Sequence, residues 1–343
     1  MMKTRAVLVV LTTVFLTVSS LEAGLSLNPL SWFSATDEAS IDPTRIKNET
    51  EQKAVTQLEK GRQKYEAGRH QSAQKIFKKI GKKYPLTEAA GEARFLHAQI
   101  RMQRGQFNRA HALLQEIVFQ NPDFPKFEAV ISNQFLCATA LMEGARSKIL
   151  FIFPGFKQYS EAMRQFEFIV ANAPYGDYAP IALMNIALIA EDQNEAEIAI
   201  DALDRLINYY PQSILASDAY YHLANTYANL VKSPEYDQGS TRQAISYYED
   251  FLALFPDDPN VGEVESNLAQ MQNILASSRK ELGDFFYLYR NNNTAALTFY
   301  NEAITIAVES ETAEEARQRI KDIEAGVRPV TGSKLLGKVL RSN

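Results

Sequence analysis

The sequence predicts an all-α fold of tandem helix-turn-helix repeats that form a right-handed α-solenoid. Blocks of similar sequence recur along the chain, apolar residues stand three and four positions apart within each block, and a proline closes most blocks. Apolar residues at this spacing form one face of a helix. The chain has 343 residues, 46% of them hydrophobic and 22% charged, which is the composition of a folded protein rather than a disordered one.

Residues 65–85 and 102–122 form the clearest pair of blocks, because they align without a gap. The matched positions are Gly68 with Gly105, Ala73 with Ala110, Phe77 with Leu114, and Pro85 with Pro122. The alanine is expected where the second helix of a unit crosses the first, since only a small side chain allows a close approach. The proline is expected just after the second helix, because it cannot continue the helical hydrogen-bond ladder.

Three further blocks repeat the same order of residue types. Their alanine, large apolar residue and proline are Ala162, Phe166 and Pro174; Ala199, Leu203 and Pro211; and Ala244, Tyr248 and Pro256. A small residue at the crossing, a large one four positions later, a closing proline and a period near 34 residues are typical of the tetratricopeptide repeat, TPR. The sequence therefore predicts a TPR array.

Residues 283–300, GDFFYLYRNNNTAALTFY, fit the same scheme as a closing unit. The asparagines suit a turn between helices, Ala296 takes the crossing position, and Tyr300 takes the large position. No proline follows, as is expected of a last repeat without a successor. One helix face can bury only some of its first four rings, so the others are expected to meet the preceding repeat or a partner.

The ends of the chain differ from this array. Residues 1–23 have the basic start, short apolar run and small residues of a secretory signal, with cleavage predicted after Ala23, Ser20 as the alternative site, and an uncleaved anchor as the alternative reading. The predicted divisions are a signal at 1–23, a linker at 24–50, N-terminal TPR units at 51–125, a unit with an insert at 126–175, further units at 176–309, and a helix end with a basic tail at 310–343. The insert, residues 144–160, has an apolar centre that is expected to pack on a neighbouring repeat, with a partner as the alternative.

The second half of the chain resembles a narrower family. Residues 174–307 contain Phe255 and Pro256 at one repeat end, an aromatic and charged segment at 281–287, and the closing helix around Ala296. In these features the segment resembles the BamD family, TPR lipoproteins of the machine that assembles β-barrel proteins in the bacterial outer membrane. Members of that family carry a lipidated cysteine after the signal, whereas the single cysteine of this sequence is Cys137. The resemblance therefore implies a location at the outer membrane through partners, without a lipobox.

The chemistry-bearing residues do not form a catalytic pattern. His70, His97, His111 and His222 fall in no zinc motif, Cys137 has no second cysteine to pair with, and no glycine-rich phosphate loop follows a strand-like run. We therefore predict no catalytic residue, no cofactor, no metal and no enzymatic activity. The net charge of -5 and the pI of about 5.6 argue against nucleic acid as a partner.

Protein binding is the predicted role, since stacked helical pairs form a concave groove lined by the first helix of each unit. The predicted groove residues are Arg62, Tyr65, Phe95, Gln99, Met102, Tyr221, Asn225 and Asn229, and the same count along the helices also gives Leu58, Met184, Leu188 and Glu191. For each of these the alternative is a place in the seam between repeats. A second, partner-docking site is predicted at Arg279, Phe285, Tyr289 and Arg290.

These features together predict an exported periplasmic scaffold that is associated with the outer membrane and acts, like BamD, in β-barrel protein assembly. Its expected partners are subunits of the assembly machine or outer-membrane protein clients. The alternative is a soluble periplasmic TPR adaptor for cell-wall or division proteins, and an enzyme would require a catalytic insert that the sequence does not contain.

Overall fold

A computed structural model describes most of the chain between the predicted signal and the basic tail. The described residues are 43–144, 148–149, 153–154, 158–233 and 238–327. The packing contacts define one compact unit over Glu49–Asn343, in which the pairs of helices lie. The signal at 1–23, most of the linker at 24–50 and residues 328–343 of the tail fall outside the described residues.

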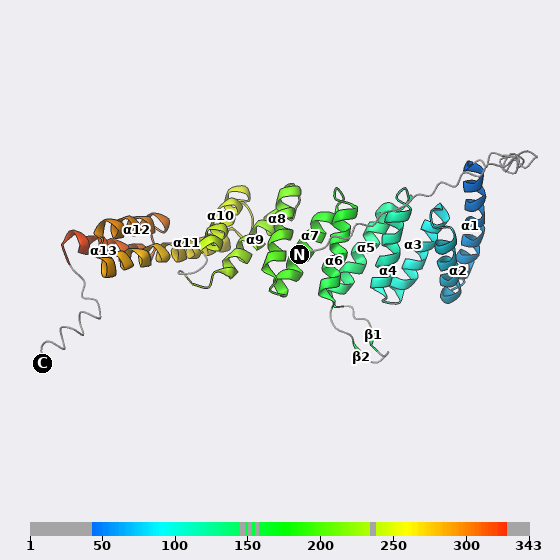
Figure 1. Cartoon of the computed structure of the whole chain (residues 1–343), viewed down its shortest axis with the longest axis horizontal. Helices are drawn as coiled ribbons and strands as arrows, with labels where there is room; N and C mark the ends of the chain where they lie inside the picture. The colour runs from blue at the N-terminus through cyan, green and yellow to red at the C-terminus, as the bar shows by residue number, and fades with distance from the viewer. Residues whose placement is uncertain (1–42, 145–147, 150–152, 155–157, 234–237, 328–343) are drawn as a thin grey trace, which may run out of the picture. The chain divides into compact units, whose positions relative to one another are not determined.

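Helices dominate the described residues, which confirms the all-α repeat prediction. The first helices of the pairs are α1 (Pro43–Glu66), α3 (Glu88–Gln103), α5 (Phe127–Met142), α7 (Tyr178–Asp192), α9 (Ala216–Leu230) and α11 (Val261–Asp284). The second helices are α2 (His70–Lys83), α4 (Phe107–Gln120), α6 (Tyr159–Asn172), α8 (Ala196–Tyr209), α10 (Gln238–Leu254) and α12 (Asn293–Ile306). From α2 onward each helix packs on the helix before and the helix after it, so neighbours in sequence are neighbours in space (Figure 1).

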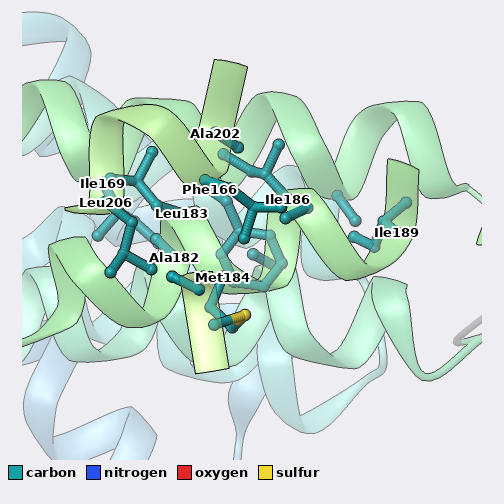
Figure 2. Close-up of a cluster of buried hydrophobic side chains, with 14 of the residues drawn as sticks. Phe166, Ile169, Ala182, Leu183, Met184, Ile186, Ile189, Ala202 and Leu206 are labelled. Carbon is teal, nitrogen blue, oxygen red and sulfur yellow. The ribbon is translucent and has the colours of Figure 1, made fainter. Parts of the chain in front are cut away.

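The predicted crossing positions are confirmed by their burial. The alanines at these positions are fully buried: Ala73, Ala110, Ala162, Ala199, Ala244 and Ala296. The large residues four positions later, Phe77, Leu114, Phe166, Leu203, Tyr248 and Tyr300, are at most 1% exposed. Figure 2 shows part of the central core, where side chains of α6, α7 and α8 interdigitate. Each closing proline stands two positions beyond the last residue of its helix, as Pro85 does after Lys83.

In two of the helix pairs, the first helix has a glycine at the point where it contacts the large residue of the second helix. A Cβ added to Gly61 would lie 2.4 Å from Phe77 Cε1, and one added to Gly283 would lie 2.6 Å from Tyr300 Cε1. Both rings are buried and cannot turn away into solvent. The close approach of the two backbones therefore requires a residue without a side chain at each position.

We expect Gly283→Ala to lower the free energy of unfolding by about 1–3 kcal/mol, because the new methyl group would overlap the Tyr300 ring. Alanine favours a helix over glycine by about 1 kcal/mol, and the overlap outweighs this gain. Gly262→Ala in the same helix is the control, since an added Cβ there meets nothing within 4 Å. Urea unfolding of both variants measures the effect. If Gly283→Ala and Gly262→Ala had the same free energy of unfolding, the close approach of Gly283 to Tyr300 would be contradicted.

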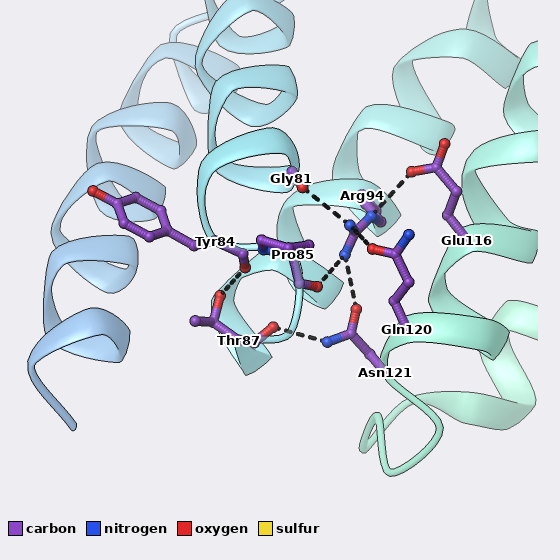
Figure 3. A network of polar contacts seen from close by, with 8 residues as sticks. All are labelled: Gly81, Tyr84, Pro85, Thr87, Arg94, Glu116, Gln120 and Asn121. Atoms are coloured by element: carbon purple, nitrogen blue, oxygen red, sulfur yellow. Dashed lines mark hydrogen bonds and ion pairs between the residues drawn. The ribbon is translucent and has the colours of Figure 1, made fainter. Parts of the chain in front are cut away.

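A buried arginine links the second and third helices to the fourth (Figure 3). The Arg94 side chain on α3 is 3% exposed. Its guanidinium donates to two backbone carbonyls at the end of α2, to two amide side chains at the end of α4, and to one carboxylate: Gly81 O at 3.1 Å, Pro85 O at 2.9 Å, Asn121 Oδ1 at 2.8 Å, Gln120 Oε1, and Glu116 Oε2 at 3.1 Å. Asn121 in turn donates to the Thr87 carbonyl at 2.9 Å. One side chain thus holds the ends of two helices in register.

The closing unit differs from the prediction in two ways. Its first helix is the end of the 24-residue α11, which continues into a π-helix, η2 (Phe285–Arg290). A further helix, α13 (Glu311–Glu324), then packs on α12 and α11. The predicted asparagine turn is confirmed, because Asn291 has a left-handed backbone with φ 51° and the Asn292 side chain accepts a hydrogen bond from Ala295 N at 3.1 Å. Among the described residues, the last pair is therefore followed by one further covering helix.

Within the insert, the structure describes two short strands, β1 (Lys148–Ile149) and β2 (Phe153–Pro154). They pair antiparallel, with Ile149 opposite Phe153. The rest of residues 145–157 lies outside the described residues, and so does the prediction that this apolar segment packs on a neighbouring repeat. Across the described part of the chain, no helix combines the length and apolar character needed to cross a membrane.

Candidate functional site

Charged residues tie the first helices together at the N-terminal end of the predicted groove. Arg62 Nη2 on α1 lies 3.1 Å from Glu92 Oε1 on α3, and Lys126 Nζ, just before α5, lies 3.0 Å from the same oxygen. The Glu92 side chain is only 13% exposed. The two cations therefore share one partly buried carboxylate, and Arg62 has a structural partner in addition to its predicted groove position.

Most of the other N-terminal groove candidates are half-buried or buried against neighbouring side chains. Phe95 is 6% exposed, with its ring centroid 6.0 Å from that of Phe124, and Met102 packs against the same cluster. Tyr65 is half-buried and meets His70 edge-on at 5.4 Å. Gln99 is half-buried on α3. The two aromatic residues and Met102 thus pack against neighbouring side chains, and their place in a binding groove stays a prediction.

The three candidates on α9 divide in a similar way. Tyr221 donates its hydroxyl hydrogen to Glu263 Oε1 on α11 at 2.6 Å, and this bond to a carboxylate is the main cause that raises the pKa of Tyr221. Asn225 accepts from the Tyr248 hydroxyl at 2.5 Å. Asn229 is exposed. Tyr221 and Asn225 therefore join α9 to its neighbours through polar contacts, and Asn229 faces solvent.

A polar cluster on α7 and α9 was not predicted as a unit. His222 Nδ1 lies 2.9 Å from Glu191 Oε2, and Thr226 donates its hydroxyl hydrogen to Glu191 Oε1 at 2.9 Å. The hydrogen bond to Glu191 raises the pKa of His222, against the opposing effect of burial. Glu191 was identified as an inward position, but nothing in the sequence shows that a histidine 31 positions later faces it.

The C-terminal docking candidates separate into a paired arginine and an exposed patch. Arg279 has a 15% exposed side chain, and its Nε lies 3.6 Å from Glu302 Oε2 on α12. Phe285, Tyr289 and Arg290 lie together on η2 and form what we term the η2 patch. The rings of Phe285 and Tyr289 are 6.2 Å apart, and the Arg290 guanidinium lies 5.3 Å from the Phe285 ring centroid.

Exposure distinguishes the η2 patch from the other rings of the segment. Phe285 is 40% exposed and Tyr289 is 72% exposed. Tyr287 is buried and donates to the Val327 carbonyl at 2.6 Å, while Phe286 stacks on Phe299 at 5.4 Å. Hydrogen bonds in a π-helix join residues five positions apart, and turns of this kind are frequent at functional sites. Here the π-helix carries Phe285, Tyr289 and Arg290 on one surface.

The described residues contain little that resembles catalytic chemistry. In this part of the chain no three His, Cys, Asp or Glu side chains are grouped so that they could hold a metal ion. Burial raises the pKa of the Cys137 thiol to about 12, which leaves it protonated and unreactive at neutral pH.

Comparison with known families divides the chain into two matched segments. Residues 155–321 match the family YfiO, described as an outer membrane lipoprotein, and residues 64–133 match a tetratricopeptide repeat family. The η2 patch lies within the first segment, and Arg62, at the N-terminal end of the predicted groove, lies two residues before the second.

Two curated relatives carry the name BamD. The outer membrane protein assembly factor BamD of Rickettsia prowazekii is 28% identical over 148 residues, which cover 43% of this chain and 59% of that protein. The BamD of Caulobacter vibrioides is 23% identical over 146 residues, covering 43% of this chain and 48% of that protein. The matched part of the chain thus spans 48% to 59% of the length of these curated relatives.

A solved structure of a thermophilic TPR protein of Thermus thermophilus is 17% identical, with a TM-score of 0.29 over 64% of this chain and 98% of that one. The family matches, the BamD relatives and the sequential packing of the helices provide the basis for classifying the chain. The described helices form a tetratricopeptide repeat fold, and residues 155–321 of the chain are similar to the YfiO family of outer membrane lipoproteins.

Proposed function

We propose that this protein is a non-enzymatic scaffold of outer-membrane β-barrel assembly, held at the periplasmic side of the outer membrane by its partners. The observation that carries the proposal is the match of residues 155–321 to the YfiO family, in which the named relatives are assembly factors. The partners proposed are other subunits of an assembly machine and unfolded outer-membrane protein clients.

The η2 patch is the proposed docking site for a companion subunit. Aromatic rings and arginine are enriched at the centres of protein interfaces, where they contribute most of the binding free energy. Phe285 and Tyr289 supply apolar area, and Arg290 supplies a planar group for a carboxylate or a carbonyl. Arg279, which lies against α12, is proposed to support the docking surface through its ion pair with Glu302.

Client segments are proposed to bind along the first-helix row. Gln99, Tyr221 and Asn229 are half-buried or exposed, so their amide and phenol groups can contact an extended peptide. The remaining groove candidates are proposed to support this row from below by packing between the helices: Arg62, Tyr65, Phe95, Met102 and Asn225. A client would then meet polar side chains on a rigid support of packed rings.

Photocrosslinking in cells tests the docking site directly. A photoreactive residue in place of Tyr289 is expected to crosslink to a β-barrel assembly subunit. The same residue in place of Tyr209, which is 73% exposed compared with 72% for Tyr289, is the matched control and is expected not to. Mass spectrometry of the envelope identifies the partner, and depletion of the protein is expected to reduce outer-membrane β-barrel proteins.

Other outcomes would reject the proposal. Crosslinks from position 289 to division or cell-wall proteins, together with a septation defect and normal barrel levels, would support the adaptor role instead. Equal crosslinking from positions 289 and 209 would show that the η2 patch has no special affinity.

A further inference from the structure

The helix α2 carries an unusual concentration of positive charge. Its solvent-exposed side contains five lysines, all of which line one shallow depression: Lys75, Lys78, Lys79, Lys82 and Lys83. We term this surface the lysine face. The opposite side of α2 is buried through Ala73, Phe77 and Ile80, which fixes the orientation of the helix and keeps the five lysines on its exposed side.

No ion pair holds the lysine face in the part of the chain that the structure describes. α2 contains no acidic residue, and none of the five lysines forms an ion pair in the described part of the chain. Residues 60–110 hold 13 Lys and Arg against 3 Glu, although the whole chain has a net charge of -5. The local field is therefore positive on an acidic protein.

Helix stability does not account for all of these lysines. Lys82 and Lys83 lie in the last turn, where positive charge is favoured by the helix dipole. Lys75, Lys78 and Lys79 lie further back, and like charges three and four positions apart on a helix repel each other. An external anionic partner would remove this repulsion.

We propose that the lysine face binds the anionic phospholipid surface of a membrane. Lysine is a compact, hydrated charge that attracts phosphate groups without a fixed geometry, as a layer of lipid head groups requires. The turn that follows α2 presents Leu86, which is 75% exposed and positioned two residues beyond Tyr84 at the end of the helix. Clusters of four to eight basic side chains are the feature that binds anionic lipid head groups, and an exposed leucine nearby in the sequence can add apolar contact.

An acidic protein partner fits this surface less well. The centres of protein interfaces are depleted of charged residues and enriched in aromatic ones. The depression on α2 is lined by lysines alone, without an apolar anchor within it. Membrane binding by the lysine face goes beyond the proposed role in barrel assembly. It does not depend on that role, because the lysine face lies on α2, whereas the η2 patch is the surface proposed to bind a companion subunit.

Vesicle sedimentation of the full chain provides the test. The protein is expected to sediment with vesicles of phosphatidylcholine mixed with phosphatidylglycerol and not with pure phosphatidylcholine, and high salt is expected to release it. The triple variant Lys75→Gln, Lys78→Gln, Lys82→Gln is expected to lose about a hundredfold in partitioning. Leu86→Ser is expected to lose about tenfold on the same vesicles.

A matched triple variant controls for net charge. Lys53→Gln, Lys232→Gln, Lys321→Gln removes three exposed lysines elsewhere and is expected to bind as the parent protein does. Equal losses in the two triple variants, or equal binding to neutral vesicles, would overturn the proposal. So would tight binding of a poly-glutamate peptide without any binding to anionic vesicles, which would identify an acidic protein as the ligand.

Discussion

Arg94→Met is expected to lower the free energy of unfolding by about 3 kcal/mol, because it removes a buried charged donor and leaves its acceptors without partners. Methionine fills a similar volume but cannot donate a hydrogen bond. The carbonyls of Gly81 and Pro85 and the side chain of Asn121 would each lose the bond that the guanidinium supplies. The contact between the ends of α2 and α4 is therefore expected to loosen.

Urea unfolding of the variant gives the measurement, with Arg205→Met as the matched control. Arg205 also contacts carboxylates, with Nη1 at 2.8 Å from Glu167 and 3.2 Å from Asp201, but its side chain is 28% exposed. Because this pair is more accessible to solvent than Arg94, its loss is expected to cost less, about 1 kcal/mol. A loss at Arg94 no larger than the loss at Arg205 would show that the buried network is dispensable.

Acidification is expected to destabilise the protein through two buried histidines. Burial is the main cause that lowers the pKa of His97 to about 4, with nearby Arg101 adding to the effect, and burial likewise lowers the pKa of His111 to about 4. In the unfolded chain both titrate near their ordinary value of about 6.5. The unfolded state therefore binds protons more tightly than the native state below that pH.

The direction and size of this effect follow from the difference in proton binding. The stability that the two neutral imidazoles support is fully present above about pH 6.5 and is lost as the pH falls toward about 4. A depression of this size corresponds to about 3 kcal/mol for each histidine. Urea unfolding at a series of pH values is expected to show a steep acid-side loss.

The variant His97→Gln, His111→Gln tests the assignment, since glutamine is polar but does not titrate. It is expected to flatten the acid-side loss. His222→Gln is the control with the opposite sign, because the Glu191 contact raises the pKa of His222. The stability that this contact supplies is fully present below the ordinary histidine pKa and is lost as the pH rises. If His222→Gln rather than the double variant flattened the acid-side loss, the assignment would be wrong.

The repeat architecture could be predicted because its determinants are local. Helix spacing, a small residue at each crossing and a proline after each second helix all act within one unit of about 34 residues. The asparagine turn at 291–293 could be predicted for the same reason. The continuation of α11 into η2 could not, since a switch to π-helical bonding depends on how Tyr287 and Phe286 pack against residues that follow later in the chain.

The candidate sites were predicted less completely, and single residues show why. Phe95 has the spacing of a groove residue, yet it is buried because Phe124 and the following helices cover it. The partners of Arg94 at the end of α4 lie 26 and 27 positions away, and neither a motif nor a period connects them. Tyr287 and Tyr289 are the same residue type two positions apart, and one is 5% exposed while the other is 72% exposed.

The order of residues alone indicates a helical repeat array, the places where its helices pair, and the family that its second half resembles. Periodicity and turn chemistry operate between residues close in the chain, so no knowledge of distant contacts is needed to recognise them. Three-dimensional packing was needed to learn which rings face solvent, how Arg94 joins three helices and that the five lysines of α2 have no ion-pair partner in the described part of the chain. Burial and charge pairing depend on residues brought from other units, and these residues are identified by their contacts in the folded chain.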